Sequence, residues 1–291
     1  MTDVPSTPAR RKITLPDLVA RASAGDRIVM VTAYDAPSAR LADEAGVDVV
    51  LVGDSAGTTA LGGDSTVPVT MEEMIVYTRA ASRGARRAFL VADMPFGSYQ
   101  VSDESAVVNA IRFAKESGAD AVKLEGAGPM IARVRAIVDA GIAVMGHIGL
   151  TPQSATLLGG YRAQGRTAQA AEQLIADAVA LERAGCFAIV LEAMPAVVAA
   201  HTTAAVHVPT IGIGAGPSCS GQVLVWHDLL GLLPGPSARF VKQYAPVGEI
   251  IAQALANYVS DVRSGAFPES QHTYGMPDAE REKLDAHLKQ S

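Results

Sequence analysis

The chain is poor in several residue types and patterns that mark particular classes of protein. Only 2 of its 291 residues are cysteine and 5% are aromatic. It contains no run of about 18 uninterrupted apolar residues. Cys186 and Cys219 are too few for a disulfide framework and lack a metal-ligand spacing. A disulfide-stapled secreted domain is therefore excluded, a membrane span is not expected, and we predict idle thiols in a reducing, cytoplasmic compartment.

Signals of charge and targeting are also scarce. The net charge is −6, with no block of basic residues, so we expect small-molecule partners and neither nucleic acid nor a membrane. Met1–Arg11 has no apolar stretch behind its arginines, which argues against a secretory signal, and we predict that residues 1–11 form a disordered N-terminus. Apolar side chains are abundant, at 49% of the sequence against 19% charged. That balance is typical of a globular chain with a sizeable core.

The apolar residues gather in short runs rich in Val, Ile and Leu. Most of these runs lack an alternation of apolar and polar residues, which is typical of strands covered on both faces in a parallel sheet. Eight such runs predict eight strands: Ile28–Ala33, Val47–Val52, Ala88–Ala92, Ala121–Leu124, Ile142–Met145, Phe187–Leu191, Thr210–Ile213 and Val223–Trp226.

Helix-like stretches separate the runs, and several of them end at a glycine. Thr70 is a plausible N-cap, with Glu73 at the spacing of a capping box. A left-handed glycine commonly stops a helix before the next strand. The stretches that end in this way are Ala36–Ala45, Asp103–Ser117, Met130–Ala140 and Thr167–Ala184.

This alternation of strands and helices predicts one (β/α)8 TIM barrel over residues 12–267. A doubly wound open sheet is the competing architecture. Leu15–Ala24 reads as an extra N-terminal helix that caps the barrel floor, and Ile250–Arg263 as a helix after the eighth strand. Residues 268–291 are expected to form a C-terminal tail, with a charged, helix-capable segment at Pro277–Ser291.

Polar or charged residues follow nearly every predicted strand. Because active sites of (β/α)8 barrels lie at the C-terminal ends of the strands, we expect these residues to share one pocket. They are Asp54 and Ser55, Asp93, Lys123 with Glu125, His147, Glu192 and the pair His227-Asp228. A single Asp after a strand is often only a helix cap. Several carboxylates on one rim would repel one another unless a cation held some of them together.

The ligand types indicate which cation to expect. Carboxylates without a cysteine or paired-histidine group suit a hard ion such as Mg²⁺. No HExxH or P-loop motif occurs, and Pro217 stands where GxGxxG would need its third glycine. The glycine-rich turn at residues 212–216 could still seat a phosphate or the tail of a cofactor.

For three of these side chains a purely structural role is an alternative to a functional one. Lys123 lies in an apolar run, where an inward-facing lysine needs a partner because burial of its charge is costly. His147, between glycines, reads equally well as a core histidine. Glu192 reads also as a carboxylate stabilised by a helix N-terminus.

The motifs resemble those of the ketopantoate hydroxymethyltransferase (3-methyl-2-oxobutanoate hydroxymethyltransferase) family, from about Lys12 to Phe267. The family usually has aspartate before Gly221-Gln222, where this chain has Ser220, which leaves the role of that loop open. The segments that carry the resemblance are 31–35 (VTAYD), 51–55 (LVGDS), 64–70 (DSTVPVT), 92–96 (ADMPF), 122–126 (VKLEG), 146–153 (GHIGLTPQ), 159–161 (GGY), 211–216 (IGIGAG) and 221–225 (GQVLV).

The resemblance implies a barrel of the phosphoenolpyruvate/pyruvate superfamily, assembled as a homodecamer (a pentamer of dimers). It implies transfer of a one-carbon unit from 5,10-methylenetetrahydrofolate to 3-methyl-2-oxobutanoate, with Mg²⁺ as cofactor, to give ketopantoate for pantothenate and coenzyme A synthesis. By position, Asp54, Asp93 and Glu125 match the metal site, and Asp54, Ser55, Asp93 and Lys123 match substrate contacts. Glu192 matches the general base, and His147 is an accessory residue whose role is open.

Two other functions compete with this one. A Mg²⁺-dependent C–C lyase of the same superfamily would also form an enolate from a 2-oxo acid. Such lyases commonly carry a cysteine on a mobile loop, and no cysteine stands at a matching place here. A barrel that has lost catalysis would show gaps among the rim residues, and none is found among the positions that match.

Overall fold

The computed structural model describes residues 11–235 and 238–290, and the expected disorder of residues 1–11 lies almost entirely outside this range. Its centre is a closed barrel in which each strand pairs in parallel with the next, and the last strand with the first. This closure confirms the predicted (β/α)8 barrel and excludes the open sheet. The strands are β1 (Ile28–Thr32), β2 (Val49–Val52), β3 (Phe89–Asp93), β4 (Ala121–Lys123), β5 (Ala143–Gly149), β6 (Ala188–Glu192), β7 (Thr210–Ile213) and β8 (Gly221–Leu224).

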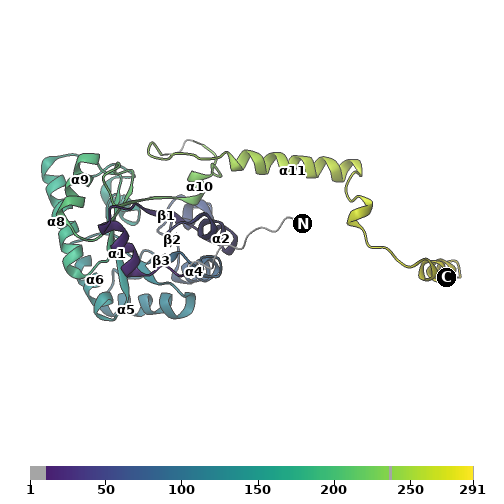
Figure 1. Cartoon of the computed structure of the whole chain (residues 1–291), viewed down its shortest axis with the longest axis horizontal. Helices are drawn as coiled ribbons and strands as arrows, with labels where there is room; N and C mark the ends of the chain where they lie inside the picture. The colour runs from purple at the N-terminus through teal and green to yellow at the C-terminus, as the bar shows by residue number, and fades with distance from the viewer. Residues whose placement is uncertain (1–10, 236–237, 291) are drawn as a thin grey trace.

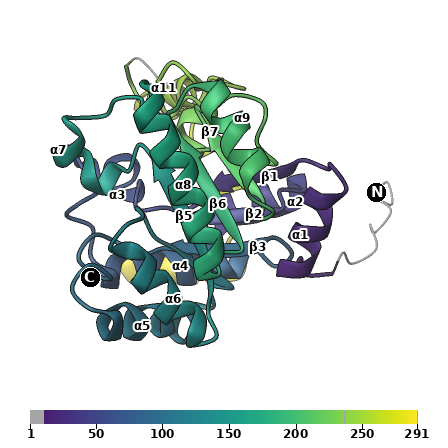
Figure 2. The same cartoon turned by 90° about the vertical axis from the view of Figure 1, so that its left-hand side faces the viewer.

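Helices surround the barrel, as Figures 1 and 2 show, and α8 lies against β5 and β6. The longer ones are α2 (Ala36–Ala45), α4 (Met71–Gly84), α5 (Asp103–Arg112), α6 (Met130–Asp139), α8 (Ala168–Ala184) and α9 (Ala196–Ala205). A π-helical turn, η1 (Phe113–Ser117), continues α5. Short elements lie in the loops: α3 (Ala56–Thr59), η2 (Pro152–Ser154), α7 (Ala155–Leu158) and α10 (Trp226–Leu229).

The local signals at the helix ends are confirmed. The Thr70 side chain accepts a hydrogen bond from the Glu73 backbone, and the Glu73 carboxylate accepts one from the Thr70 backbone, which completes the capping box. Gly46 and Gly185 end α2 and α8 in the left-handed conformation, with φ of 94° and 102°. These caps fix where each helix turns back toward the next strand.

Two apolar clusters form the core, because side chains along each strand point alternately to the two sides of the sheet. Val50, for example, packs between the barrel and its helices, whereas Val49 packs inside the barrel. Leu18 of α1 (Leu15–Ser23) joins the inner cluster with Ile28 and Phe89 from the first residues of their strands. The N-terminal helix therefore closes the barrel floor, as predicted.

β5 extends to Gly149, four residues beyond the predicted end at Met145, so His147 lies within the strand. The eighth strand also differs from its predicted bounds. It runs from Gly221 to Leu224 and pairs with β1, whereas the apolar run Val223–Trp226 predicts a later start and end. Trp226, His227 and Asp228 belong to α10 and not to the strand. The reason is that closure of the barrel sets the pairing with β1. Gly221 and Gln222 pair with this strand although neither belongs to the apolar run.

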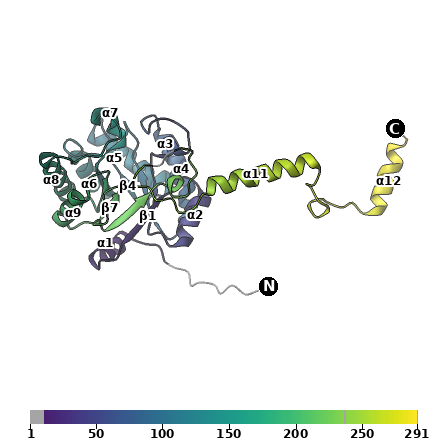
Figure 3. The ribbon, with the colours of Figure 1, turned by 90° about the horizontal axis from the view of Figure 1, so that it is seen from above.

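The C-terminal segment leaves the barrel. Figures 1 and 3 show α11 (Val247–Ser264) extending away from it, followed by η3 (Ser270–His272) and α12 (Asp278–Leu288). Every residue from 249 to 290 is exposed. The domain boundary at residue 267 stays a prediction. Among residues 11–235 and 238–290, no helix is both long and apolar enough to cross a membrane.

Candidate active site

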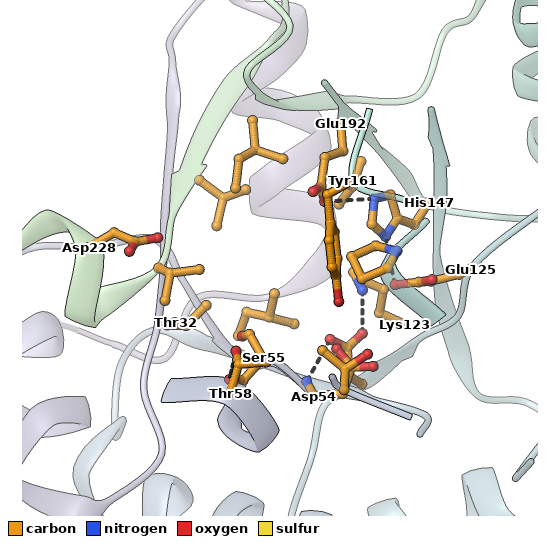
Figure 4. Close-up of a pocket in the computed structure, with 18 of the residues that line it drawn as sticks. Thr32, Asp54, Ser55, Thr58, Lys123, Glu125, His147, Tyr161, Glu192 and Asp228 are labelled. Carbon is orange, nitrogen blue, oxygen red and sulfur yellow. Dashed lines mark hydrogen bonds and ion pairs between the residues drawn. The ribbon is translucent and has the colours of Figure 1, made fainter. Parts of the chain in front are cut away.

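The inward-facing side chains of the strands change character from the barrel floor to the top. On β3 the inward row reads Phe89, Val91, Asp93, and on β4 and its extension it reads Ala121, Lys123, Glu125. The apolar residues at the start of each row fill the floor, and the charged residues at its end line a cavity of about 310 Å³ at the C-terminal end of the strands. Figure 4 shows this cavity.

Nearly all of the residues expected at the rim line that one cavity: Asp54, Ser55, Asp93, Lys123, Glu125, His147 and Glu192. They come from β2 to β6 and the loops that follow them, and Asp228 lines the cavity from α10. His227 is the exception, because its ring packs against Tyr34 and it lines a neighbouring cavity. The glycine-rich turn after β7 packs closely on its neighbours, since a Cβ at Gly214 would meet the ring of Phe240 and one at Gly216 would meet Ala196. A phosphate or cofactor tail at this turn stays a prediction.

Asp54 and Asp93 form the centre of the charged end. Both are buried, at 4% and 2% exposure, and the Asp54 backbone N–H donates to Asp93 Oδ2 at 3.1 Å. Burial, together with the negative charges of Asp93 and Glu125, raises the pKa of Asp54 to about 8. The two carboxylates thus lie in a place that favours a positive charge.

Lys123 supplies one such charge. Its Nζ forms a buried ion pair with Asp93 Oδ1. Burial opposes the charge, but the carboxylates of Asp93, Glu125 and Asp54 outweigh it and raise the pKa of Lys123 above its ordinary value. The lysine is therefore a fixed cation at the end of the cavity.

His147 stands between two glutamates. Its Nδ1 lies 3.4 Å from Glu125 Oε1 and its Nε2 lies 3.1 Å from Glu192 Oε2, at ion-pair distance but outside hydrogen-bond angles. Burial and Lys123 oppose protonation, yet the two glutamates raise the pKa of His147 to about 9. The imidazole is thus a buried cation that links the carboxylate cluster to Glu192.

A glycine allows this arrangement at the end of β5. Gly149 has a φ of +97°, and a Cβ placed there would lie 2.2 Å from the carbonyl oxygen of Glu192. Any larger residue would push β5 away from β6. The close approach keeps His147 and Glu192 within reach of each other.

Gln153 and Tyr99 are site residues to which sequence reasoning gives no role. The Gln153 side chain donates to Asp54 Oδ2 at 3.0 Å, and its backbone N–H donates to Glu125 Oε2 at 3.0 Å. The Tyr99 hydroxyl donates to Gln153 Oε1 at 2.6 Å. These bonds orient two carboxylates at once. Gln153 lies in one of the recognised motifs, but no local signal reveals that its amide meets residues far away in the sequence.

Ser55 and Ser220 have different surroundings. Ser55 lies at the rim, where its Oγ is 2.8 Å from the hydroxyl of Tyr34. Ser220 precedes β8, and its Oγ accepts a hydrogen bond from the backbone of Thr210 at the first residue of β7. The serine in place of the usual aspartate therefore joins the starts of two strands and does not line the cavity.

The chemistry of the donor set fits a hard divalent cation held by few protein ligands. Across residues 11–235 and 238–290, no group of three or more His, Cys, Asp or Glu side chains has the arrangement of a ready-made metal site. Glu125 already accepts from Gln153 and lies beside His147. Asp54 and Asp93 also have partners, Gln153 and Lys123, but they are neighbours joined by the hydrogen bond from the Asp54 backbone to Asp93. Mg²⁺ is commonly bound by one or two carboxylates together with substrate and water.

Fold and cavity together define a (β/α)8 barrel with a charged cavity at the C-terminal ends of its strands, the position at which barrels of this class carry their active sites. The sequence profile of the ketopantoate hydroxymethyltransferase family matches residues 12–270. The chain belongs to this family.

Curated relatives agree with the profile. A 3-methyl-2-oxobutanoate hydroxymethyltransferase of Moorella thermoacetica is 58% identical over 265 residues, covering 91% of this chain and 98% of the relative. The protein of the same name from Thermobifida fusca is 55% identical over 266 residues, covering 91% and 95%. The family predicted from the motifs is confirmed.

Solved structures with low sequence identity share the fold. Phosphonopyruvate hydrolase in complex with oxalate and Mg²⁺ has a TM-score of 0.59 at 12% identity, covering 94% of this chain and 96% of the other. A 2,3-dimethylmalate lyase of the PEP mutase/isocitrate lyase superfamily has a TM-score of 0.55 at 17% identity, covering 94% and 98%. These neighbours share the barrel fold of this chain.

Proposed function

We propose that this chain transfers a hydroxymethyl group from 5,10-methylenetetrahydrofolate to 3-methyl-2-oxobutanoate and so produces 2-dehydropantoate (ketopantoate) for pantothenate and coenzyme A synthesis. The names of the curated relatives support the reaction. The observation that carries it is a cavity with buried acids and bases at one end, where Glu192 lies next to the His147 cation at 15% side-chain exposure. A biosynthetic role of this kind is consistent with a cytoplasmic location.

Glu192 is the proposed general base. It removes the proton from C3 of the oxo acid, a hydrogen that is acidic only if the enolate is stabilised. The enolate carbon bonds to the methylene carbon of the folate, and both bonds from that carbon to folate nitrogens break. Water supplies the hydroxyl group, and the C3 proton and one proton of water end on the two nitrogens of tetrahydrofolate.

Three residues are proposed to hold Mg²⁺: Asp54 and Asp93, with Glu125 contributing its negative charge at the same end of the cavity. The ion, when bound, supplies positive charge to the oxygens of the 2-oxo acid. Lys123 adds a second positive charge next to Asp93, and Asp54, Ser55, Asp93 and Lys123 contact the substrate. His147 is the positioning residue of Glu192, since its Nε2 is the cationic neighbour of that carboxylate.

An assay of the purified protein tests the reaction. With 3-methyl-2-oxobutanoate, methylenetetrahydrofolate and Mg²⁺ we expect ketopantoate, and excess EDTA should stop its formation. Absence of product in the presence of Mg²⁺ would overturn the proposal. Product formed equally well after complete metal removal would overturn its metal-dependent form.

Asp93→Ala tests the metal ligands. Loss of one of two neighbouring carboxylates should raise the Mg²⁺ concentration needed for half-maximal activity by at least about tenfold, since second-shell changes alone cost about that much. Asp64→Asn removes a different carboxylate that lines the same cavity and is the matched control. An unchanged Mg²⁺ titration in Asp93→Ala would refute the site.

A C–C lyase is the alternative outcome of the same assay. Such an enzyme would split a 2-oxo acid adduct without folate. Both cysteines of the chain are buried, at 2% and 0% exposure, and neither lines the cavity, so a cysteine-bearing catalytic loop has no counterpart here. The hydroxymethyl transfer is therefore favoured.

We propose that the chain works as a homo-oligomer, a homodecamer (a pentamer of dimers) by family resemblance, and that α11 takes part in its assembly. Exposed apolar residues recur on one face of α11, at Ile251, Leu255, Tyr258, Val259 and Val262. A groove of about 720 Å³ lies over the outer face of β1 and β8, where Val29 is 51% exposed. A second copy of α11 has the length and apolar face to cover such a strand surface.

Light scattering coupled to gel filtration tests this assembly. Leu255→Glu should reduce the particle mass of the full chain, because it places a charge on the apolar face of α11. Asn257→Glu, on the other side of the same helix, is the control and should leave the mass unchanged. A monomeric wild-type chain, or an unaffected Leu255→Glu variant, would refute the role of α11.

A further inference from the structure

The active-site cavity has a second end that the chemistry of the oxo acid leaves unused. The carboxylate cluster, Lys123 and His147 lie at one end, and Asp228 lies across the cavity from them, as Figure 4 shows. Ile213, Val223 and Val225 line the walls. A small branched 2-oxo acid bound at the charged end has no need of a carboxylate on the far side, where a second negative charge would repel it.

Asp228 is a carboxylate without a partner. It comes from α10, directly after β8, and is partly buried. Within the described part of the chain its side chain makes no hydrogen bond and no ion pair, and burial raises its pKa. A partly buried carboxylate accepts hydrogen bonds and donates none, so its natural ligand carries N–H or O–H donors.

Two aromatic rings stand at the same cavity. Tyr161, on the loop after α7, is 58% exposed, and Phe240, on the loop after α10, is 38% exposed. Gly214 allows Phe240 to settle over the end of β7, since a Cβ there would lie 2.7 Å from Cδ1 of the ring and its φ is +65°. Exposed aromatic faces at a cavity stack on planar heterocycles with little dependence on ring substituents.

We propose that Asp228, Tyr161 and Phe240 form the subsite for the pterin ring of the folate co-substrate. Asp228 accepts hydrogen bonds from the amino group and the adjacent ring N–H of the pterin, a pair of parallel donors that matches a carboxylate. The two aromatic rings pack on the faces of the heterocycle. This subsite rests on the proposed function, which requires a folate donor.

The subsite also explains why the cavity has two chemically different ends. A ring held at Asp228 keeps its one-carbon unit in the same enclosed space as C3 of the oxo acid, so both reactants are oriented before the bond forms.

Asp228→Asn tests the subsite with two one-carbon donors. Loss of a charged hydrogen-bond acceptor should lower kcat/KM for methylenetetrahydrofolate by about 10- to 150-fold. Free formaldehyde carries the same one-carbon unit without a pterin, so activity with it should change by less than about twofold. Exchange of the C3 hydrogen with deuterated water, which needs no donor at all, should also persist and reports that the variant is folded.

Matched variants sharpen the result. Glu249→Gln removes a carboxylate that shares a neighbouring cavity with Asp228 but does not line the active site, and it should leave all three activities unchanged. Tyr161→Leu should raise KM for the folate donor by about fivefold or more, whereas Tyr161→Phe should restore it, because stacking needs the ring and not the hydroxyl.

The outcomes of these assays distinguish a failure of the proposed subsite from a failure of the proposed function. Unchanged kcat/KM for the folate donor in Asp228→Asn overturns the subsite, and so does an equal loss of activity with formaldehyde. If the wild-type protein makes no product with either donor and exchanges no C3 hydrogen, the proposed function fails instead.

Discussion

The floor and the top of the barrel interior are built from the same strands but have different roles. At the floor, Ile28, Phe89 and Leu18 pack in an apolar cluster that α1 closes. At the top, Asp54, Asp93 and Lys123 are buried just as deeply, at 2–4% exposure, but bring charges of both signs together. The floor stabilises the folded barrel. The buried charges at the top lower its stability, because they are desolvated, and serve the reaction instead. Two steps of two residues along β3, from Phe89 through Val91 to Asp93, separate the floor from the top.

The largest expected effect lies at the top of the barrel. Glu192→Gln should slow exchange of the substrate C3 hydrogen with deuterated water by about 100- to 10,000-fold, the usual contribution of a positioned general base. Exchange is followed by NMR in the presence of Mg²⁺. The Mg²⁺ titration serves as the control and should remain close to that of the wild type. Unimpaired exchange would remove Glu192 from the role of base.

The floor should respond in stability and not in chemistry. Phe89 is 5% exposed, and its ring centroid lies 5.6 Å from that of Phe187. Phe89→Ala should therefore lower the free energy of unfolding by about 3–5 kcal/mol, measured by urea denaturation, because it leaves a cavity. The folded fraction should keep its C3 exchange activity.

A surface truncation provides the comparison for that loss. Val108 on α5 is 52% exposed, and Val108→Ala should change the free energy of unfolding by less than about 0.5 kcal/mol. If Phe89→Ala cost no more than this control, the floor would not be the structural end of the barrel.

A smaller effect of opposite sign is expected at the top. Asp54→Asn removes a buried carboxylate whose pKa is raised by burial and by Asp93 and Glu125. Without metal, the variant should gain about 0.5–2 kcal/mol in the free energy of unfolding while losing activity. Thermal unfolding in EDTA measures the gain. A less stable variant would show that Asp54 stabilises the fold, and the top of the barrel would then not differ from the floor in this respect.

The sequence predicts the top of the barrel better than its periphery. Lys123 and Glu125 stand two residues apart, so they lie on the same side of a strand, and the parallel order of strands brings Asp54 and Asp93 to them. The topology of a barrel brings the strand ends together, so polar residues at those ends can be recognised from the sequence alone. Gln153 is different, because its role depends on an amide that reaches Asp54 across the cavity.

The bounds of β8 were predicted less well for a related reason. Most of the first seven strands follow a glycine that ends the preceding helix, whereas the apolar run of the eighth passes without a break into α10. Its register is set by β1, nearly the whole barrel away in sequence. No local pattern contains that information, and Asp228 consequently reads as a strand end when it is a helix residue.

The pairing of β1 with β8 has a consequence for the synthesis of the chain. One edge of β1 pairs with β2, but the other edge, at Ile28–Val31, finds its partner only at residues 221–224. A nascent polypeptide therefore carries two unpaired sheet edges until most of it has left the ribosome. Open edges invite pairing with other chains. A prematurely terminated product is therefore an aggregation hazard and not a smaller working enzyme.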